Sequence, residues 1–298
     1  MSETELLALH RRFRRYCAVE EGLRPRTVDM MGCCMGTFAR RTGVRGVGEI
    51  TSAVLQDFFY EGSERRHWSY WHYANHHKYL RKFLDWCVAR GHLKSNPISA
   101  VGLPRKPQAL PRRLSHAQAQ AILYASFNHP WRYAFERHRN HAMVATLLYT
   151  GLRAAELLAL QLVDVDLEAG ALLVRAGKGG KDRYVPVHRK LRYILKRYLA
   201  ERGRVGRTVP QLFVSSTRDR PASYKTLGSV CRTLSEATGV KFTPHCLRHT
   251  FGSVAIEQRM GLVQLKEIMG HSSITSTMVY LRMSPEGLRD SLDRIELF

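Results

Sequence analysis

The first third of the chain is patterned for helices, because apolar residues recur there every three or four positions. Residues 4–19 show the pattern most clearly: Leu6, Leu9 and Phe13 fall on one face, with arginines between them. The same period returns over residues 27–40, 51–62 and 69–89. We therefore predict an all-helical N-terminal region.

The helical pattern stops at residues 95–113, which are rich in proline and in basic residues. Proline lacks a backbone donor and pushes the preceding residue toward extended conformations, so this stretch does not continue a helix. We predict a basic linker at 104–114, between a helical domain over 1–103 and a second domain over 115–298.

The second domain mixes helical and strand patterns. Ser115 is a good N-cap for a helix that runs to about Phe127. Residues 171–175 and 183–187 are typical of two short strands joined by a hairpin turn at 177–182. Helical patterns cover residues 141–149, 154–160, 188–202, 223–238, 245–259, 262–269, 274–281 and an amphipathic tail at 285–298. The pattern predicts a mostly α fold with a small β-sheet, an α+β protein.

The charge narrows the class of partner. The chain has 298 residues and a formal net charge of +22 at pH 7, and the excess is present in both domains. A charge of this size and spread indicates a polyanionic partner, of which nucleic acid is the commonest. The alternatives are a charge that serves solubility alone, an enzyme for acidic substrates, and a protein of the membrane surface.

Other classes are disfavoured. No apolar run approaches the roughly 20 residues that a membrane-spanning helix needs. The N-terminus carries acidic residues and no long apolar core, so we do not expect a secretory signal. The 6 cysteines include no CxxC pair. We expect reduced thiols in a cytoplasmic protein, and no zinc site.

Taken alone, the candidate functional residues have ordinary structural explanations. Arg153 suits a salt bridge at a helix end, and Lys178 suits a solvated turn. His271 suits a helix cap, and Tyr280 is one of 13 tyrosines. Each of these side chains by itself indicates no chemistry.

Two short motifs fail as binding sites. The glycine-rich loop at 177–181 does not match a phosphate-binding P-loop, because Asp182 follows it where Ser or Thr is needed, and a strand follows where a helix is needed. His245 and His249 lie four apart, as zinc ligands on a helix do, but no glutamate lies between them. Arg248 beside them suits an anion better than a metal ion.

The order and spacing of the motifs together resemble a known family. The segments TGLRAAELLAL, AGKGGKDRYVPV, TPHCLRHTF and IMGHSSITSTMVYLRM are similar to the conserved boxes of the tyrosine recombinases, the phage integrase family, and within it to the simple two-domain Xer type. The resemblance is strong over 115–283. Residues 1–105 resemble the family's helical, SAM-like core-binding domain in outline only.

The resemblance implies a phosphoryl-transfer site. Tyr280 would attack the scissile phosphate and form a 3′-phosphotyrosyl link, releasing a 5′-hydroxyl. Arg153 and Arg248 would bind the phosphate oxygens, since a planar guanidinium bonds them in pairs. Lys178 would protonate the leaving oxygen, with Lys181 as the alternative for that role.

The remaining roles fall to histidines and one carboxylate. By resemblance, His245 would handle the proton of the tyrosine and His271 would hydrogen-bond the phosphate. His249 and Glu156 match supporting positions, and the choice between a supporting and a purely structural role stays open. The two arginines and the lysine take the place of Mg²⁺, so the resemblance implies no metal and no cofactor.

The resemblance also implies partners and a setting. We expect a C-shaped clamp around double-stranded DNA with specific recombination sites, and a homo-tetramer on two such sites. The tail at 285–298 would dock on a neighbouring protomer, or pack back on its own. The setting would be the bacterial cytoplasm, near the nucleoid, and no accessory protein is specified.

Departures from the Xer pattern and rival functions remain. Gly180 and Asp182 stand where Xer chains often have Asn and Glu, and the segment after His249 lacks the usual run of small residues, which suggests a subfamily of mobile-element recombinases.

The rival functions are a type IB topoisomerase and a DNA-binding regulator without catalysis. The six matching catalytic positions argue against the regulator.

Overall fold

The chain divides into two compact units, Met1–Gln108 and Ala109–Phe298. The computed structural model describes residues 4–107, 112–175, 182–271 and 273–283. The predicted fold class, mostly helical with a small sheet, is confirmed. No helix among the described residues combines the length and the apolar character needed to cross a membrane.

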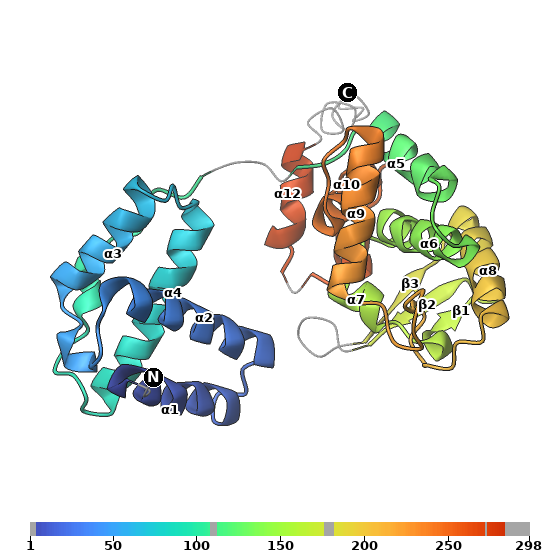
Figure 1. The fold of residues 1–298 in the computed structure, drawn as a ribbon. Helices are drawn as coiled ribbons and strands as arrows, with labels where there is room; N and C mark the ends of the chain where they lie inside the picture. The colour runs from blue at the N-terminus through green and yellow to red at the C-terminus, as the bar shows by residue number, and fades with distance from the viewer. Residues whose placement is uncertain (1–3, 108–111, 176–181, 272, 284–298) are drawn as a thin grey trace, which may run out of the picture. The chain divides into compact units, whose positions relative to one another are not determined.

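The first unit is built from amphipathic helices, as their periodicity predicted. They are α1 (Glu5–Val19), α2 (Pro25–Thr42), α3 (Ser52–Glu64) and α4 (Tyr70–Ala89) (Figure 1). Thr51 and Ser69 cap α3 and α4 by accepting hydrogen bonds from backbone N–H groups in the first turn. The apolar faces of the helices meet in one core, in which Phe13, Phe38 and Phe83 are fully buried.

The start of the proline-rich stretch belongs to the first unit. Residues Pro97–Ala100 form the short 3₁₀ helix η2, and Ile98 is buried in the core. Ser52 donates to the Pro97 carbonyl at 3.0 Å, and the Tyr73 hydroxyl donates to the Gly102 carbonyl at 2.9 Å. Proline stops the helix here, but side chains of α3 and α4 satisfy the backbone and hold it in place.

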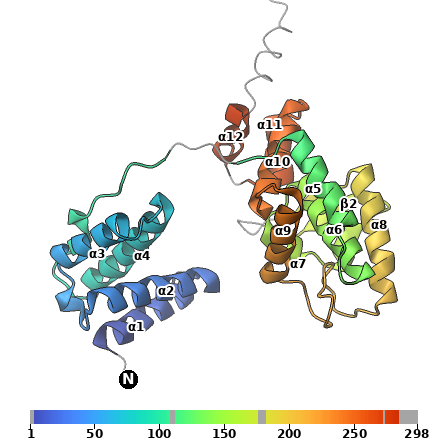
Figure 2. The same cartoon turned by 45° about the horizontal axis from the view of Figure 1, so that its top comes forward.

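The second unit is built around α6 (Ala134–Thr150), which packs against α5 (His116–Asn128), α8 (Arg189–Arg204) and α10 (Pro244–Glu257) (Figure 2). Its other helices are α7 (Ala154–Ala159), α9 (Tyr224–Thr238), α11 (Leu262–Met269) and α12 (Thr275–Met283). Helix α6 begins seven residues before the predicted start, at Ala134 rather than 141. The early turns carry charged residues, and the buried Arg139 is satisfied by Asn140 and by the Val214 carbonyl.

The predicted strand pair is present in a three-stranded antiparallel sheet of order β1-β2-β3. The strands are β1 (Val165–Asp166), β2 (Ala171–Val174) and β3 (Arg183–Pro186), and Val174 pairs with Arg183 beside the turn. The predicted turn at 177–182 lies outside the described residues except for Asp182. Strand β1 has two residues, too few to leave a periodic signal, and was not predicted.

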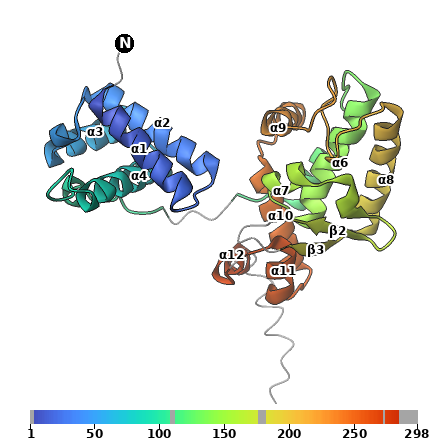
Figure 3. The same cartoon turned by 90° about the horizontal axis from the view of Figure 1, so that it is seen from below.

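Three helix ends converge in this unit. Helices α6 and α11 both end at a glycine in the left-handed conformation, Gly151 with φ 63° and Gly270 with φ 64°. Helix α10 begins after Thr243, whose side chain caps it. Helices α11 and α12 lie side by side, and α11 also packs against β3 (Figure 3). These ends carry four of the predicted catalytic residues, Arg153, His245, Arg248 and His271.

Candidate active site

Five of the six predicted catalytic residues lie together, four of them at these helix ends and the fifth on α12. Arg153 follows α6, His245 and Arg248 lie in the first turns of α10, His271 follows α11, and Tyr280 is on α12. The sixth, Lys178, lies outside the described residues, as does its alternative Lys181.

Arg153 is held by a carboxylate and a carbonyl. Its Nη1 donates to Glu156 Oε1 at 2.7 Å, and its Nη2 donates to the Gly270 carbonyl at 2.9 Å. Glu156 also accepts from the Arg153 backbone N–H at 2.9 Å. The salt bridge at a helix end is thus present, and it aims the guanidinium toward the end of α11.

Arg248 is buried, with 3% of its surface exposed. Its Nη1 donates to the Gly151 carbonyl at 2.5 Å and its Nη2 to the Met269 carbonyl at 2.9 Å. Burial, and then the neighbouring Arg153, lower the pKa of Arg248 to about 10, so the side chain stays charged at neutral pH. The glycine-terminated ends of α6 and α11 therefore supply the acceptors that fix this cation.

A third arginine joins this cluster and was not predicted. Arg183, at the start of β3, donates to Glu156 Oε2 at 2.8 Å and to the Ile268 carbonyl at 2.9 Å. One signal in the sequence points to it. Arg183 and the buried Val185 are two apart on a strand, so they share the inward face, and an inward arginine needs a buried partner.

Glu156 stays ionised between these arginines. Burial alone would raise its pKa, but hydrogen bonds from Arg183 and Arg153, together with their charge, lower the pKa of this carboxyl below its usual range. Glu156 is only 8% exposed. A buried carboxylate with two arginine partners is a fixed anchor rather than a proton donor.

The three histidines of the site, His245, His249 and His271, are neutral at pH 7. The Nε2 atoms of His245 and His249 lie 2.9 Å apart, and His271 Nδ1 lies 2.8 Å from the Thr277 hydroxyl. Burial, with a contribution from His245, lowers the pKa of His249 to about 4. Burial and then Arg248 and Arg153 lower the pKa of His271 to about 4. Each neutral ring offers one donor and one acceptor.

Tyr280 is packed against α10. Its ring centroid lies 5.6 Å from that of His249 and 6.2 Å from that of His271. A Cβ at Gly252 would lie 2.5 Å from Tyr280 Cζ, so the ring reaches the helix only because residue 252 has no side chain. Burial raises the pKa of Tyr280, and the positive charges of Arg248 and Arg153 oppose that shift.

The low histidine pKa values predict how stability depends on pH. A free histidine titrates near 6.5, whereas His249 and His271 titrate near 4 in the folded chain. Between these values the unfolded chain binds more protons, so the free energy of unfolding falls as pH is lowered from about 6.5 to about 4. Urea denaturation across this interval measures the slope. His271→Asn should flatten it; a stability that rises on acidification contradicts the prediction.

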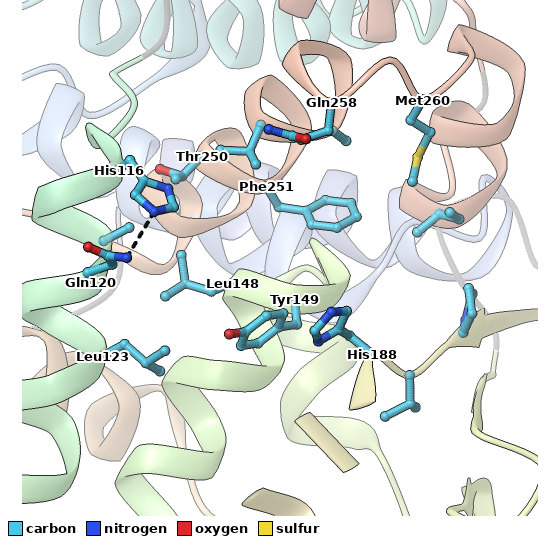
Figure 4. Close-up of a pocket in the computed structure, with 16 residues that line it drawn as sticks. His116, Gln120, Leu123, Leu148, Tyr149, His188, Thr250, Phe251, Gln258 and Met260 are labelled. Atoms are coloured by element: carbon cyan, nitrogen blue, oxygen red, sulfur yellow. Dashed lines mark hydrogen bonds between the residues drawn. The ribbon is translucent and has the colours of Figure 1, made fainter. Parts of the chain in front are cut away.

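A separate apolar cavity of about 560 Å³ lies between α5, α6 and α10 (Figure 4). Leu123, Leu148, Phe251 and Val254 line it, among others, and none of the five predicted catalytic residues that the structure describes does. No cluster of three or more potential metal-ligating side chains occurs among the residues described.

Comparison with known proteins agrees with this geometry. A model described as the phage integrase family matches residues 112–286. Tyrosine recombinase XerA of Pyrococcus furiosus is 32% identical over 65% of this chain and 65% of its own length. Tyrosine recombinase XerC of Salmonella typhi is 27% identical over 98% of this chain and 97% of its own length.

A solved structure shows the same fold. The XerH site-specific recombinase, bound to its difH substrate in a pre-cleavage complex, matches with a TM-score of 0.76 at 18% identity, over 100% of this chain and 98% of that one. The family model matches more than half of the chain, so the chain belongs to the phage integrase family. Within that family it is similar to the Xer recombinases along nearly its whole length, and the resemblance found in the sequence is confirmed.

Proposed function

We propose that this chain is a site-specific DNA recombinase that cleaves and rejoins duplex DNA through a covalent 3′-phosphotyrosyl intermediate. One observation carries the proposal. Arg153 and Arg248 are each held 2.9 Å from neighbouring carbonyls of Gly270 and Met269, in the cluster that also holds Tyr280. Two cations fixed around a tyrosine suit attack on a phosphodiester.

The chemistry is a transesterification. The Tyr280 oxygen attacks the phosphorus, the bond to the 5′-oxygen breaks, and the phosphate stays on the tyrosine through its 3′-linked strand. The phenolic proton passes to His245, and Lys178 gives a proton to the leaving 5′-oxygen. Arg153, Arg248 and His271 bind the non-bridging oxygens as charge develops there. The bond energy is kept in the phosphotyrosine, so rejoining needs no nucleotide triphosphate.

The phosphate reaches Tyr280 only after a local rearrangement. The ring is 1% exposed and packs against α10 at Gly252. A group this buried does not contact a DNA backbone directly. We infer that DNA engagement shifts α12, on which the tyrosine lies.

The partner is duplex DNA, held mainly through its phosphates. The net charge of +22 supports this, as does the difH complex of XerH. The N-terminal helical unit at 1–103 and the catalytic unit from 115 would clamp the duplex, joined by the basic linker at 104–114. Affinity should therefore fall steeply with salt concentration. The setting would be the cytoplasm of a bacterium, at the nucleoid.

Mapping covalent adducts on DNA tests the proposal. The purified chain is incubated with genomic fragments from its host, trapped with denaturant, and the 3′ ends attached to protein are sequenced. Recurrent adducts at one sequence motif, and recombination between two copies of it, are expected. Adducts without sequence preference, with relaxation of plasmids lacking the motif, would instead indicate a topoisomerase.

Strand cleavage should not depend on a divalent metal. The charges that Mg²⁺ supplies in other phosphoryl-transfer sites would come from the two arginines and Lys178. The rate of adduct formation on the mapped site should change less than twofold in excess EDTA. A complete loss that added Mg²⁺ restores would contradict this prediction.

The assembly would be a tetramer on two DNA sites, linked by the tail at 285–298. Leu288, Leu292 and Ile295 are spaced as on one helix face. We propose that this segment of one protomer occupies the apolar cavity beside Leu148 in the next. An apolar cavity of about 560 Å³ is large enough for several such side chains.

Deleting 285–298 should therefore impair synapsis more than binding to one site. Gel-shift affinity for a single site should change less than threefold, while formation of the two-site complex should fall at least tenfold. Leu148→Gln in the cavity should give the same defect, and should add little to the deletion. If the deletion and Leu148→Gln reduced two-site complex formation independently, so that their fold-reductions multiplied, docking of the tail in this cavity would be contradicted.

A further inference from the structure

Three consecutive carbonyls at the end of α11 each accept a hydrogen bond from a different arginine. The Ile268 carbonyl accepts from Arg183, the Met269 carbonyl from Arg248 and the Gly270 carbonyl from Arg153, all at 2.9 Å. The carbonyl end of a helix carries partial negative charge and favours cations. The end of α11 thus sets the spacing of these three guanidinium groups.

Arg183 also shares a carboxylate with Arg153. Its Nη1 and Nη2 donate to Glu156 Oε1 and Oε2 at 3.2 and 2.8 Å, while Arg153 Nη1 shares Oε1 at 2.7 Å. The Arg183 and Glu156 side chains are only 13% and 7% exposed. Arg183 therefore ties strand β3, helix α7 and helix α11 together at one point.

Close packing restricts this position further. A Cβ at Gly270 would lie 2.6 Å from Arg183 Nη1, and residue 270 also needs a positive φ of 64°. The Arg183 guanidinium thus lies against the backbone of the turn that carries the Gly270 carbonyl. Any shift of Arg183 moves both partners of Arg153, the carboxylate and the carbonyl.

We propose that Arg183 is a positioning residue for strand cleavage, which holds Glu156 and the end of α11 so that Arg153 and Arg248 meet the scissile phosphate together. This inference rests on the proposed recombinase function. It adds a third arginine that acts on the reaction without touching the phosphate itself. Arg183→Met would leave Glu156 with one arginine partner and would free the Ile268 carbonyl.

The expected defect is in the chemical step. Arg183→Met should lower the rate of adduct formation on the mapped site about 10- to 100-fold, the range that loss of precise positioning produces, with gel-shift affinity unchanged within threefold. The matched control is Arg175→Met, directly after the paired strand β2, which removes an arginine ion-paired with Asp164 at 2.6 Å. It should leave cleavage within twofold of the wild-type rate.

A double-mutant cycle tests whether the effect passes through Arg153. In the Arg183→Met background, Arg153→Ala should reduce the rate far less than it does in the wild-type chain, because the guanidinium is already misplaced. If Arg183→Met caused only a general structural defect, its fold-reduction in rate and that of Arg153→Ala would multiply in the double variant. Full multiplication of the two effects overturns the proposal.

The pH profile supplies a readout that general loss of structure does not move. His271 is faced by Arg183 from β3, Arg248 and His249 from α10, Arg153 before α7 and Tyr280 from α12. Loss of one nearby positive charge stabilises the protonated imidazole, so the acid limb of the cleavage rate should move to higher pH. Arg183→Lys keeps the positive charge but loses the paired hydrogen bonds of the guanidinium. It should return the acid limb of the pH profile to its wild-type position but restore only part of the cleavage rate.

The outcomes separate the two proposals. A wild-type chain that forms no adducts overturns the recombinase function and this inference with it. A wild-type chain that cleaves, with Arg183→Met equally fast, overturns only the role of Arg183. Circular dichroism melting of each variant identifies unfolding; if Arg183→Met does not fold, Arg183→Gln, which also removes the charge, carries the same rate and pH comparison.

Discussion

Replacing Tyr280 with phenylalanine is expected to abolish covalent adducts while leaving the fold and DNA binding intact. The change removes one oxygen, the proposed nucleophile, and keeps the ring that packs on Gly252 and lies between His249 and His271. Adduct formation on a nicked suicide substrate, followed on denaturing gels, should fall at least 10⁴-fold, to background.

The matched control is another buried tyrosine. Tyr198 donates to the Leu212 carbonyl at 2.8 Å in the core of the same unit. Tyr198→Phe loses one buried hydrogen bond, worth about 1 kcal/mol, and should lower the melting temperature without slowing cleavage. If Tyr280→Phe still formed adducts, the nucleophile would be a different residue.

Most helices of both units were predictable because each buries one face. Periodic apolar positions located α1, α4 and α9 to within two residues of their observed ends. Helix α6 shows where the pattern fails. From Arg139 onward it is buried nearly all round, and the polar Arg139 and Asn140 lie inside the core, so the helix shows no amphipathic period.

The candidate site was predictable in its residues but not in its contacts. The spacing of the boxes singled out Arg153, Arg248, His271 and Tyr280, because resemblance to a family carries residue identities directly. It does not show which backbone groups hold them. The carbonyls at the end of α11 have no side-chain signature, since any residue supplies one, and they became visible only in the folded chain.

Arg183 was missed for a related reason. On a strand of only four residues, one inward arginine is a weak signal, and its partner Glu156 lies on a different element. Pairing across elements depends on tertiary packing, which a local pattern does not encode. The same holds for Gly252, whose missing side chain matters only because the Tyr280 ring lies over it.

Arg248 is the residue whose loss should damage both rate and stability. Arg248→Ala removes a cation from the proposed phosphate site and leaves the Gly151 and Met269 carbonyls buried without this donor. Loss of one preorganised donor typically lowers the rate about 10²- to 10³-fold. An unsatisfied buried acceptor typically costs about 1–3 kcal/mol. Both a slower suicide cleavage and a lower melting temperature are expected.

Arg248→Lys separates these two effects. A lysine keeps the positive charge and can satisfy one carbonyl, but its single ammonium group cannot bond both carbonyls and a phosphate as the planar fork does. The melting temperature should recover in part, while cleavage stays at least about 10²-fold slow. For a substrate with a neutral methylphosphonate at the scissile position, removal of Arg248 should lower the cleavage rate less, because this substrate presents less charge to stabilise. Equal losses on both substrates would mean that Arg248 supports the fold of the helix ends and not the charge of the phosphate.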